Sequence, residues 1–179
     1  MSGLGGTAPD DAGARVRVQL SLFVPPEVGV QLEALRQVMD PIQASLIPAH
    51  VTLCREDELV GVSPKELEAR LAAAEACSIH LRFGPAEVFS EHGVLLPCVA
   101  GAQAFQKLRR RVLASETVRE HAPHLTLAHP RNPRAAGNTA DALRGLPDAL
   151  EVRFATVFRI QQSGAAAWRV LQRYSLASR

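Results

Sequence analysis

The chain has 179 residues, of which 47% are hydrophobic and 21% are charged. This balance is typical of one globular domain, or of two small lobes that share a core, and it excludes a disordered chain. Twenty basic and 18 acidic residues leave a formal net charge of +2. The charge argues against a whole-surface attraction for long nucleic acid and is compatible with a local basic cleft.

The cysteines and the N-terminus indicate the cellular setting. Cys54, Cys77 and Cys98 show no metal-ligand spacing, and an odd number does not suit a disulfide framework, so we expect buried thiols in a reducing cytoplasm. No apolar run approaches the roughly 18 residues of a membrane span. Residues 1–14 lack the features of a signal peptide and predict a flexible tail before a single bilobed domain over 15–179. No apolar stripe suggests an interface, so we expect a monomer.

The first part of the chain alternates between strand and helix signals. Residues 15–24 alternate polar with apolar side chains, the period of a half-buried strand, and Pro25-Pro26 then opens a helix. Asp40-Pro41 breaks that helix, and Ser63-Pro64 supplies an N-cap for the next one. In chain order we predict a strand over 15–24, a helix with Val28, Leu32, Leu35 and Met39 inward, a short strand over 49–54, and a helix from Ser63 to near Cys77 with Leu67, Leu71 and Ala74 inward.

The second part predicts more strands than helices. Gly101 precedes an amphipathic helix in which Arg109, Arg110 and Arg111 lie mostly outside the apolar stripe, as a solvated face. The predicted elements are strands over 79–83, 86–89 and 94–100, a helix with Phe105, Leu108 and Val112 inward, a strand over 125–128, a loop over 131–138, a weak helix near 139–144, and strands over 150–162 and 166–177 joined as a hairpin across Ser163-Gly164. Helices mixed with antiparallel strands favour an α+β fold.

One tetrapeptide pattern occurs twice, as His50-Val51-Thr52-Leu53 and as His124-Leu125-Thr126-Leu127. Pro48 lies two residues before the first histidine, and Pro123 directly precedes the second. Since alternate residues of a strand share a face, each segment presents a histidine and a threonine on one face and two apolar side chains on the other. Two such segments in one small protein suggest a pseudo-twofold pair that faces a shared cleft.

Two imidazoles and two hydroxyls suit phosphodiester chemistry without a metal. Near neutral pH, one of two coupled histidines can be neutral while the other is protonated, which supplies a general base and a general acid. Threonine hydroxyls and a protonated histidine donate hydrogen bonds to phosphate oxygens. We therefore expect an in-line displacement in which one histidine takes a proton from water and the other gives a proton to the leaving oxygen.

The paired motifs make the chain resemble the two-histidine phosphoesterase superfamily, and within it the bacterial family of 2′–5′ RNA ligases and RNA 2′,3′-cyclic phosphodiesterases. The resemblance extends over residues 20–26, over 87–101 with the helix that follows, and over 119–127. It implies a bilobed α+β fold, with two pseudo-twofold related lobes of antiparallel strands and flanking helices around a central cleft. It also implies cofactor-free and metal-free hydrolysis of 2′,3′-cyclic phosphates to 2′-phosphates, with 2′–5′ ligation of RNA ends in some members.

The resemblance further implies a role for each motif residue. His124 would activate water, and His50 would protonate the 3′ oxygen. Thr52 and Thr126 would hold the phosphate. RNA 2′,3′-cyclic phosphate ends or small cyclic nucleotides are then the expected ligands.

The sequence departs from the family after the second motif. Relatives often carry an arginine two residues beyond it, where this chain has His129, with Arg131 two residues further on. His129 and Arg131 are therefore the candidate substrate-binding residues. Aromatic residues make up only 4% of the chain, and base stacking depends on them. A non-RNA cyclic phosphate, or a nucleotide-binding module without turnover, is the alternative.

A metal site is a further alternative, because His121, His124 and His129 lie close in sequence. Strand alternation places His121 and His129 on the face opposite His124, so we expect no metal. Cys54 shares the face of the first motif histidine, but no neighbour activates it as a nucleophile. We expect Cys54 to pack at the floor of the cleft.

Overall fold

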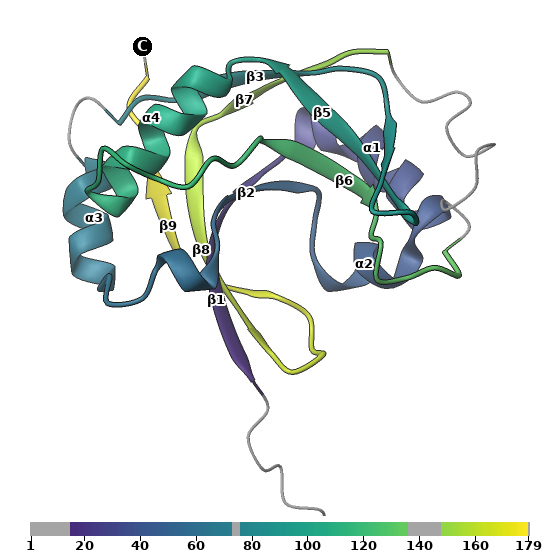
Figure 1. Ribbon diagram of the computed structural model, residues 1–179, viewed down its shortest axis with the longest axis horizontal. Helices are drawn as coiled ribbons and strands as arrows, with labels where there is room; N and C mark the ends of the chain where they lie inside the picture. The colour runs from purple at the N-terminus through teal and green to yellow at the C-terminus, as the bar shows by residue number, and fades with distance from the viewer. Residues whose placement is uncertain (1–14, 73–75, 136–147, 179) are drawn as a thin grey trace, which may run out of the picture.

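Two antiparallel sheets organise the chain in the computed structural model, which describes residues 15–72, 76–135 and 148–178 (Figure 1). The first sheet has the order β2-β1-β8-β9, and the second has the order β4-β5-β3-β7 with β6 joined to β5. The strands of the first sheet are β1 (Val16–Phe23), β2 (His50–Cys54), β8 (Thr156–Ser163) and β9 (Arg169–Ser175). Those of the second are β3 (Ile79–Phe83), β4 (Glu87–Phe89), β5 (Gly93–Ala100), β6 (His124–Ala128) and β7 (Leu150–Phe154). The expected α+β class is confirmed.

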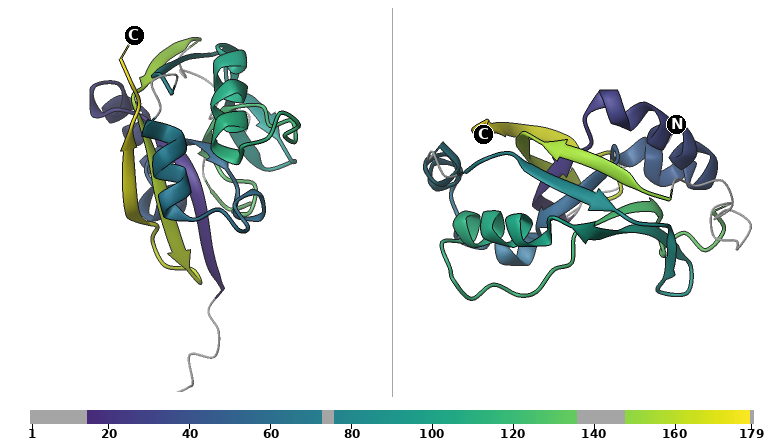
Figure 2. Two further views of the ribbon diagram at one scale, coloured as in Figure 1. Left: turned by 90° about the vertical axis from the view of Figure 1, so that its left-hand side faces the viewer. Right: turned by 90° about the horizontal axis from the view of Figure 1, so that it is seen from above.

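The helices lie in two pairs at opposite ends of the molecule (Figure 1). One pair is α1 (Pro26–Met39) with α2 (Pro41–Leu46), and the other is α3 (Pro64–Ala72) with α4 (Ala102–Leu113). A 3₁₀ turn, η1 (Glu56–Glu58), follows β2. In the left panel of Figure 2, the purple and yellow strands of the first sheet lie to one side and the teal helix α4 lies to the other. No helix in the described part of the chain is long and apolar enough to cross a membrane.

Local sequence signals explain where the helices begin. Ser63 and Glu66 form a reciprocal capping pair: the Ser63 backbone N–H donates to the Glu66 carboxylate at 2.8 Å, and the Glu66 N–H donates to the Ser63 hydroxyl at 3.2 Å. Gly101 precedes α4 with a φ of 93°, and a Cβ there would lie 2.1 Å from the His80 carbonyl oxygen. Glycine is therefore required at the turn from β5 into α4.

The core is one cluster that joins the apolar faces of the strands of both sheets to apolar residues of the helices. Leu20, Leu22, Val51 and Leu53 of the first sheet are fully buried, and their counterparts Leu81, Phe83, Leu96, Leu125 and Leu127 of the second sheet are at most 1% exposed. Most of the predicted inward residues of the helices are buried as well, namely Leu32, Met39, Leu67, Leu71, Phe105, Leu108 and Val112, whereas Val28 and Leu35 are only half-buried. Burial of these side chains supplies the main driving force for folding.

Two elements differ from the sequence-based expectation. The single strand predicted over 150–162 is two strands, because β7 ends at Phe154, Ala155 intervenes, and β8 enters the other sheet. Helix α2 was not expected, although Asp40 caps it by accepting a hydrogen bond from the Gln43 N–H at 3.2 Å. The predicted hairpin at the C-terminus is confirmed as the antiparallel pair β8 and β9. The tail over 1–14, Ala74 and the weak helix near 139–144 lie outside the described residues.

Candidate active site

A cleft of about 560 Å³ lies where β2 and β6 approach each other. All six residues singled out from the sequence line it, namely His50, Thr52, His124, Thr126, His129 and Arg131. The structure therefore brings the two motifs together in one cavity. The cleft is basic, because it is also lined by Arg15, Arg17, Arg36 and Arg55, against the carboxylates of Glu56 and Asp57.

The two motif strands, β2 and β6, share one local geometry. In each strand the histidine and the threonine are half-buried, and the other three residues are buried. The His50 Nδ1 lies 2.8 Å from the carbonyl oxygen of Pro48, and the His124 Nδ1 lies 3.0 Å from that of Ala122. Both histidines thus bond to the carbonyl two residues before them.

These carbonyl bonds fix the tautomer of both motif histidines. A carbonyl oxygen accepts only, so Nδ1 carries the proton that is donated to it. The Nε2 atom of each neutral ring therefore keeps its lone pair and is free to take a proton. An aromatic ring lies 6.3 Å from each imidazole, Phe23 beside His50 and Phe89 beside His124.

The surroundings of His50 favour its neutral form. Desolvation of the ring is the main cause that lowers the pKa of His50 to about 4, and the nearby charge of Arg36 adds to it. Arg36 is 4% exposed, and its guanidinium donates to Glu33 at 2.7 Å and to the Ile47 carbonyl at 2.9 Å. The Glu33 carboxylate in turn accepts from the Ala49 N–H. The segment that leads into β2 is therefore held by side chains of α1.

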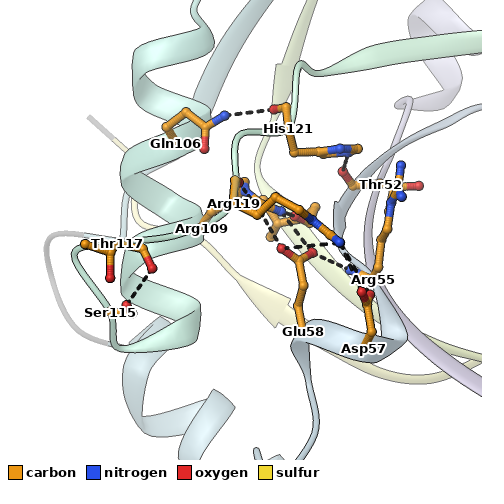
Figure 3. Close-up of polar contacts among 11 residues, drawn as sticks. Thr52, Arg55, Asp57, Glu58, Gln106, Arg109, Ser115, Thr117, Arg119 and His121 are labelled. Carbon is orange, nitrogen blue, oxygen red and sulfur yellow. Dashed lines mark hydrogen bonds and ion pairs between the residues drawn. The ribbon is translucent and has the colours of Figure 1, made fainter.

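His121 lines the cleft as well, which corrects its expected place on the opposite face. Its ring centroid lies 5.8 Å from that of His124, and its Nε2 lies 3.1 Å from the Thr52 carbonyl oxygen (Figure 3). His121 precedes β6, so the alternation of the strand does not apply to it. Desolvation and the charges of Arg109 and Arg55 lower the pKa of His121 to about 4. A neutral His121 thus links the approach to β6 with the strand β2.

His129 also faces the cleft rather than the opposite side, because β6 ends one residue before it. Its Nδ1 accepts a hydrogen bond from the Arg131 backbone N–H at 3.0 Å, so the neutral ring carries its proton on Nε2. Desolvation and the charge of Arg131 lower the pKa of His129. His129 therefore offers a neutral N–H donor, whereas the two motif histidines offer lone pairs.

Arg109 was expected on a solvated helix face and is fully buried instead. Its guanidinium donates to both carboxylate oxygens of Glu58, at 2.6 and 3.3 Å, and to the carbonyls of Leu53 and Arg119 (Figure 3). Desolvation alone would raise the pKa of Glu58, but the hydrogen bonds and charge of Arg109, with help from Arg119, lower it. The ion pair joins α4 to η1, and the bond to the Leu53 carbonyl joins α4 to β2.

Several residues that line the cleft carry no signal in the sequence, and Cys54 does not lie at the floor of the cleft as expected. Arg17, Arg36 and Arg55 line the cleft, yet isolated arginines carry no motif that would have marked them. Cys54 is fully buried and does not line the cleft, and desolvation raises its pKa to about 12, which makes it a poor nucleophile. Within 15–72, 76–135 and 148–178, no group of three His, Cys, Asp or Glu side chains is placed to hold a metal ion.

Comparisons with known proteins agree with this geometry. A family model described as the 2′-5′ RNA ligase superfamily matches residues 24–166. Escherichia coli LigT complexed with ATP has a TM-score of 0.60 and 18% identity, over 90% of this chain and 98% of LigT. LigT complexed with 3′-AMP has a TM-score of 0.51 and 16% identity, over 90% of this chain and 98% of LigT. A protein described as a phosphoesterase has a TM-score of 0.54 and 16% identity, over 91% of this chain and 99% of that protein. No curated protein matches the chain in sequence.

Proposed function

We propose, since the chain belongs to the 2′-5′ RNA ligase superfamily, that it hydrolyses 2′,3′-cyclic phosphates to 2′-phosphates without a metal ion. The observation that carries the proposal is the matched pair of histidines in one cleft, each with its Nδ1 bonded to a backbone carbonyl. Two imidazoles with free Nε2 atoms provide the base and the acid that an in-line displacement needs.

In the proposed step, the Nε2 of His124 takes a proton from water, and the water oxygen forms a bond to phosphorus. The bond from phosphorus to the 3′ oxygen breaks, and His50 gives its proton to that oxygen. The product is a 2′-phosphate, and a 5′ hydroxyl in place of water would form a 2′–5′ linkage. Thr52 and Thr126 donate hydrogen bonds to the non-bridging oxygens.

The lowered pKa of His50 has to be reconciled with its role as the acid. Without substrate, burial and the cation of Arg36 keep the ring neutral. A phosphate beside the ring places a negative charge near it, and an opposite charge raises the pKa of a histidine. His50 therefore takes up its proton together with the substrate. Substrate binding should consume a proton between about pH 4 and the raised pKa of His50 in the complex, which a titration in buffers of different ionisation enthalpy would measure.

The cleft suits a nucleotide or an RNA end. It combines four histidines with five arginines, Arg15, Arg17, Arg36, Arg55 and Arg131, and arginine suits phosphate oxygens. The related LigT has been solved with ATP, with phosphate and with 3′-AMP. Phe89 is the one Phe, Tyr or Trp side chain that lines the cleft among the described residues, which favours recognition of the phosphate over stacking on the base. This keeps a non-RNA cyclic phosphate as the second candidate substrate.

The test is hydrolysis of nucleoside 2′,3′-cyclic phosphates in excess chelator, with identification of the product. Release of the 2′-phosphate would support the proposal. A 3′-phosphate product would reverse the leaving oxygen and contradict the role of His50 at the 3′ oxygen. Loss of turnover on chelation would contradict the metal-free mechanism. Binding of the nucleotide without turnover would favour another cyclic phosphate or a binding module.

A further inference from the structure

Asp40 is a fully buried acidic residue at the junction of α1 and α2. Its Oδ1 accepts from the Gln43 N–H at 3.2 Å, which caps α2. A helix cap alone does not require burial, because one carboxylate oxygen meets it at the surface. The remaining bonds of Asp40 therefore call for a second explanation.

Those bonds lead to the other motif strand, nearly 90 residues along the chain. The Asp40 Oδ2 accepts from the His129 backbone N–H at 2.9 Å, and its Oδ1 accepts from the Asn132 side-chain amide at 2.8 Å. His129 directly follows β6, and the Asn132 N–H donates to the His129 carbonyl at 3.0 Å. The buried carboxylate of Asp40 thus accepts hydrogen bonds from both ends of the turn over 129–132.

The turn over 129–132 determines which ring nitrogen of His129 carries the proton in the cleft. Within it, the Arg131 N–H donates to His129 Nδ1, so the proton of the neutral ring lies on Nε2. Both His129 and Arg131 line the cleft. The backbone of His129 is held by Asp40, and its ring is held by the turn that Asp40 closes.

We propose that Asp40 is a positioning residue that holds the turn over 129–132 so that His129 directs its Nε2–H toward the substrate phosphate. The inference rests on the proposed function for the identity of the substrate. Asp40 does not line the cleft and does not touch the phosphate in this scheme. Its influence passes through the backbone of His129.

The sharpest variant is Asp40→Asn, which keeps the size of the side chain. Its oxygen still accepts from Gln43 and Asn132, but its amide group now faces the His129 N–H, donor against donor. The variant also removes a negative charge, and by charge alone phosphate would bind more tightly. A positioning role predicts the opposite, a KM about tenfold higher with kcat within twofold, as expected when one charge-assisted hydrogen bond is lost.

Two controls separate positioning from charge and from stability. Asp57→Asn removes a carboxylate that does line the cleft, so by charge alone it should lower KM, which is the opposite of the effect predicted for Asp40→Asn. Asp40→Asn made in a His129→Ala background should raise KM no further, because the ring through which it acts is gone. An unchanged KM in the single variant, or an equal rise in both backgrounds, would overturn the proposal.

Binding of inorganic phosphate, measured by titration calorimetry, keeps this test separate from the test of turnover. If the protein hydrolyses no cyclic phosphate but Asp40→Asn weakens phosphate binding only when His129 is present, the proposed function fails and the positioning role stands. If Asp40→Asn does not fold, Asn132→Ser loosens the other end of the turn without touching the cap of α2. Asn132→Ser should raise the phosphate Kd about threefold, and no change would overturn the proposal.

Discussion

The two motif strands have the same backbone geometry but different neighbours. In β2 and in β6, a half-buried histidine bonds to the carbonyl two residues earlier, and an aromatic ring lies 6.3 Å away. The segment before β2 is held by the charged pair Glu33 and Arg36 of α1. The segment before β6 is held by α4, where neutral Gln106 donates to the His121 carbonyl at 2.8 Å. Equivalent strands thus place their histidines in unequal electrostatic surroundings.

The helices also contact the strands crosswise. Arg109 of α4 donates to the Leu53 carbonyl of β2, and Asp40 at the end of α1 accepts from the residue after β6. Each motif strand is therefore held by both ends of the molecule. The matching geometry of the two strands thus fixes where the imidazoles lie, while the helix side chains give them different surroundings.

The largest expected effect tests whether both histidines are needed. His50→Ala and His124→Ala should each lower kcat by about 10²- to 10⁴-fold, because each removes one partner of the acid–base pair. Steady-state hydrolysis of a nucleoside 2′,3′-cyclic phosphate measures this, and circular dichroism checks the fold. Full activity in either variant would contradict the paired roles, since only one of the two histidines would then act.

The crosswise contact of α4 is tested by Arg109→Met. Removing the guanidinium leaves Glu58 buried without its partner, so the free energy of unfolding should fall by about 3–5 kcal/mol. Urea denaturation measures the loss. The control is Arg110→Met on the same helix, whose contact to Glu116 is 3.9 Å long and exposed, and it should change stability by less than about 0.5 kcal/mol. Equal effects of the two variants would show that Arg109 has no special role.

The pH dependence of stability tests the neutral histidines on both sides of the cleft. The pKa values of His50 and His121 are lowered to about 4 in the folded protein and are near 6.5 in the unfolded chain. Their contribution is therefore complete above about pH 6.5 and is lost as the pH falls toward 4, on the order of 2 kcal/mol for each histidine once solvent screening is allowed for.

Urea denaturation at pH 7.5 and at pH 4.5 measures this loss. His121→Phe keeps a ring beside Phe105 and removes one titrating group, so its stability should fall less between the two pH values. A decline as steep as that of the unmodified protein would contradict the neutral state of His121.

The smallest effect concerns the neutral contact before β6. Gln106→Leu removes the hydrogen bond to the His121 carbonyl, worth about 1 kcal/mol, and should lower kcat/KM about fivefold. Gln103→Leu, at an exposed position of the same helix, is the matched control and should be neutral. If kcat/KM fell in both variants, the cause would be the changed surface of α4 and not the lost hydrogen bond to the segment before β6.

The sequence predicted the parts of the molecule that depend on local pattern. Alternation located β2 and β6, and the repeated tetrapeptide pointed to the cleft that the structure contains. The same alternation misplaced His121 and His129, because β6 extends only from His124 to Ala128 and both residues lie beyond its ends. Pro123 and Pro130 flank these ends, and that signal was available.

Long-range partners account for the remaining differences. Arginine on a helix is usually solvated, and nothing near Arg109 in sequence indicates that Glu58 lies beside it. The division of residues 150–162 at Ala155 is equally hidden, because both parts have the apolar pattern of a strand. Asp40-Pro41 predicts the end of a helix, but an acidic cap before proline also begins one, and α2 starts there.

The strand order of the first sheet has a consequence for how the protein is made. β1, near the start of the chain, pairs with β8, so that Val16 lies opposite Ser163. A ribosome releases the first strand long before its partner emerges, and β1 has one edge unpaired until then. Such distant pairing is typical of slow folding. We infer that β1 and β2 wait for β8 and β9, which the ribosome releases later, to complete the sheet on which the first histidine lies.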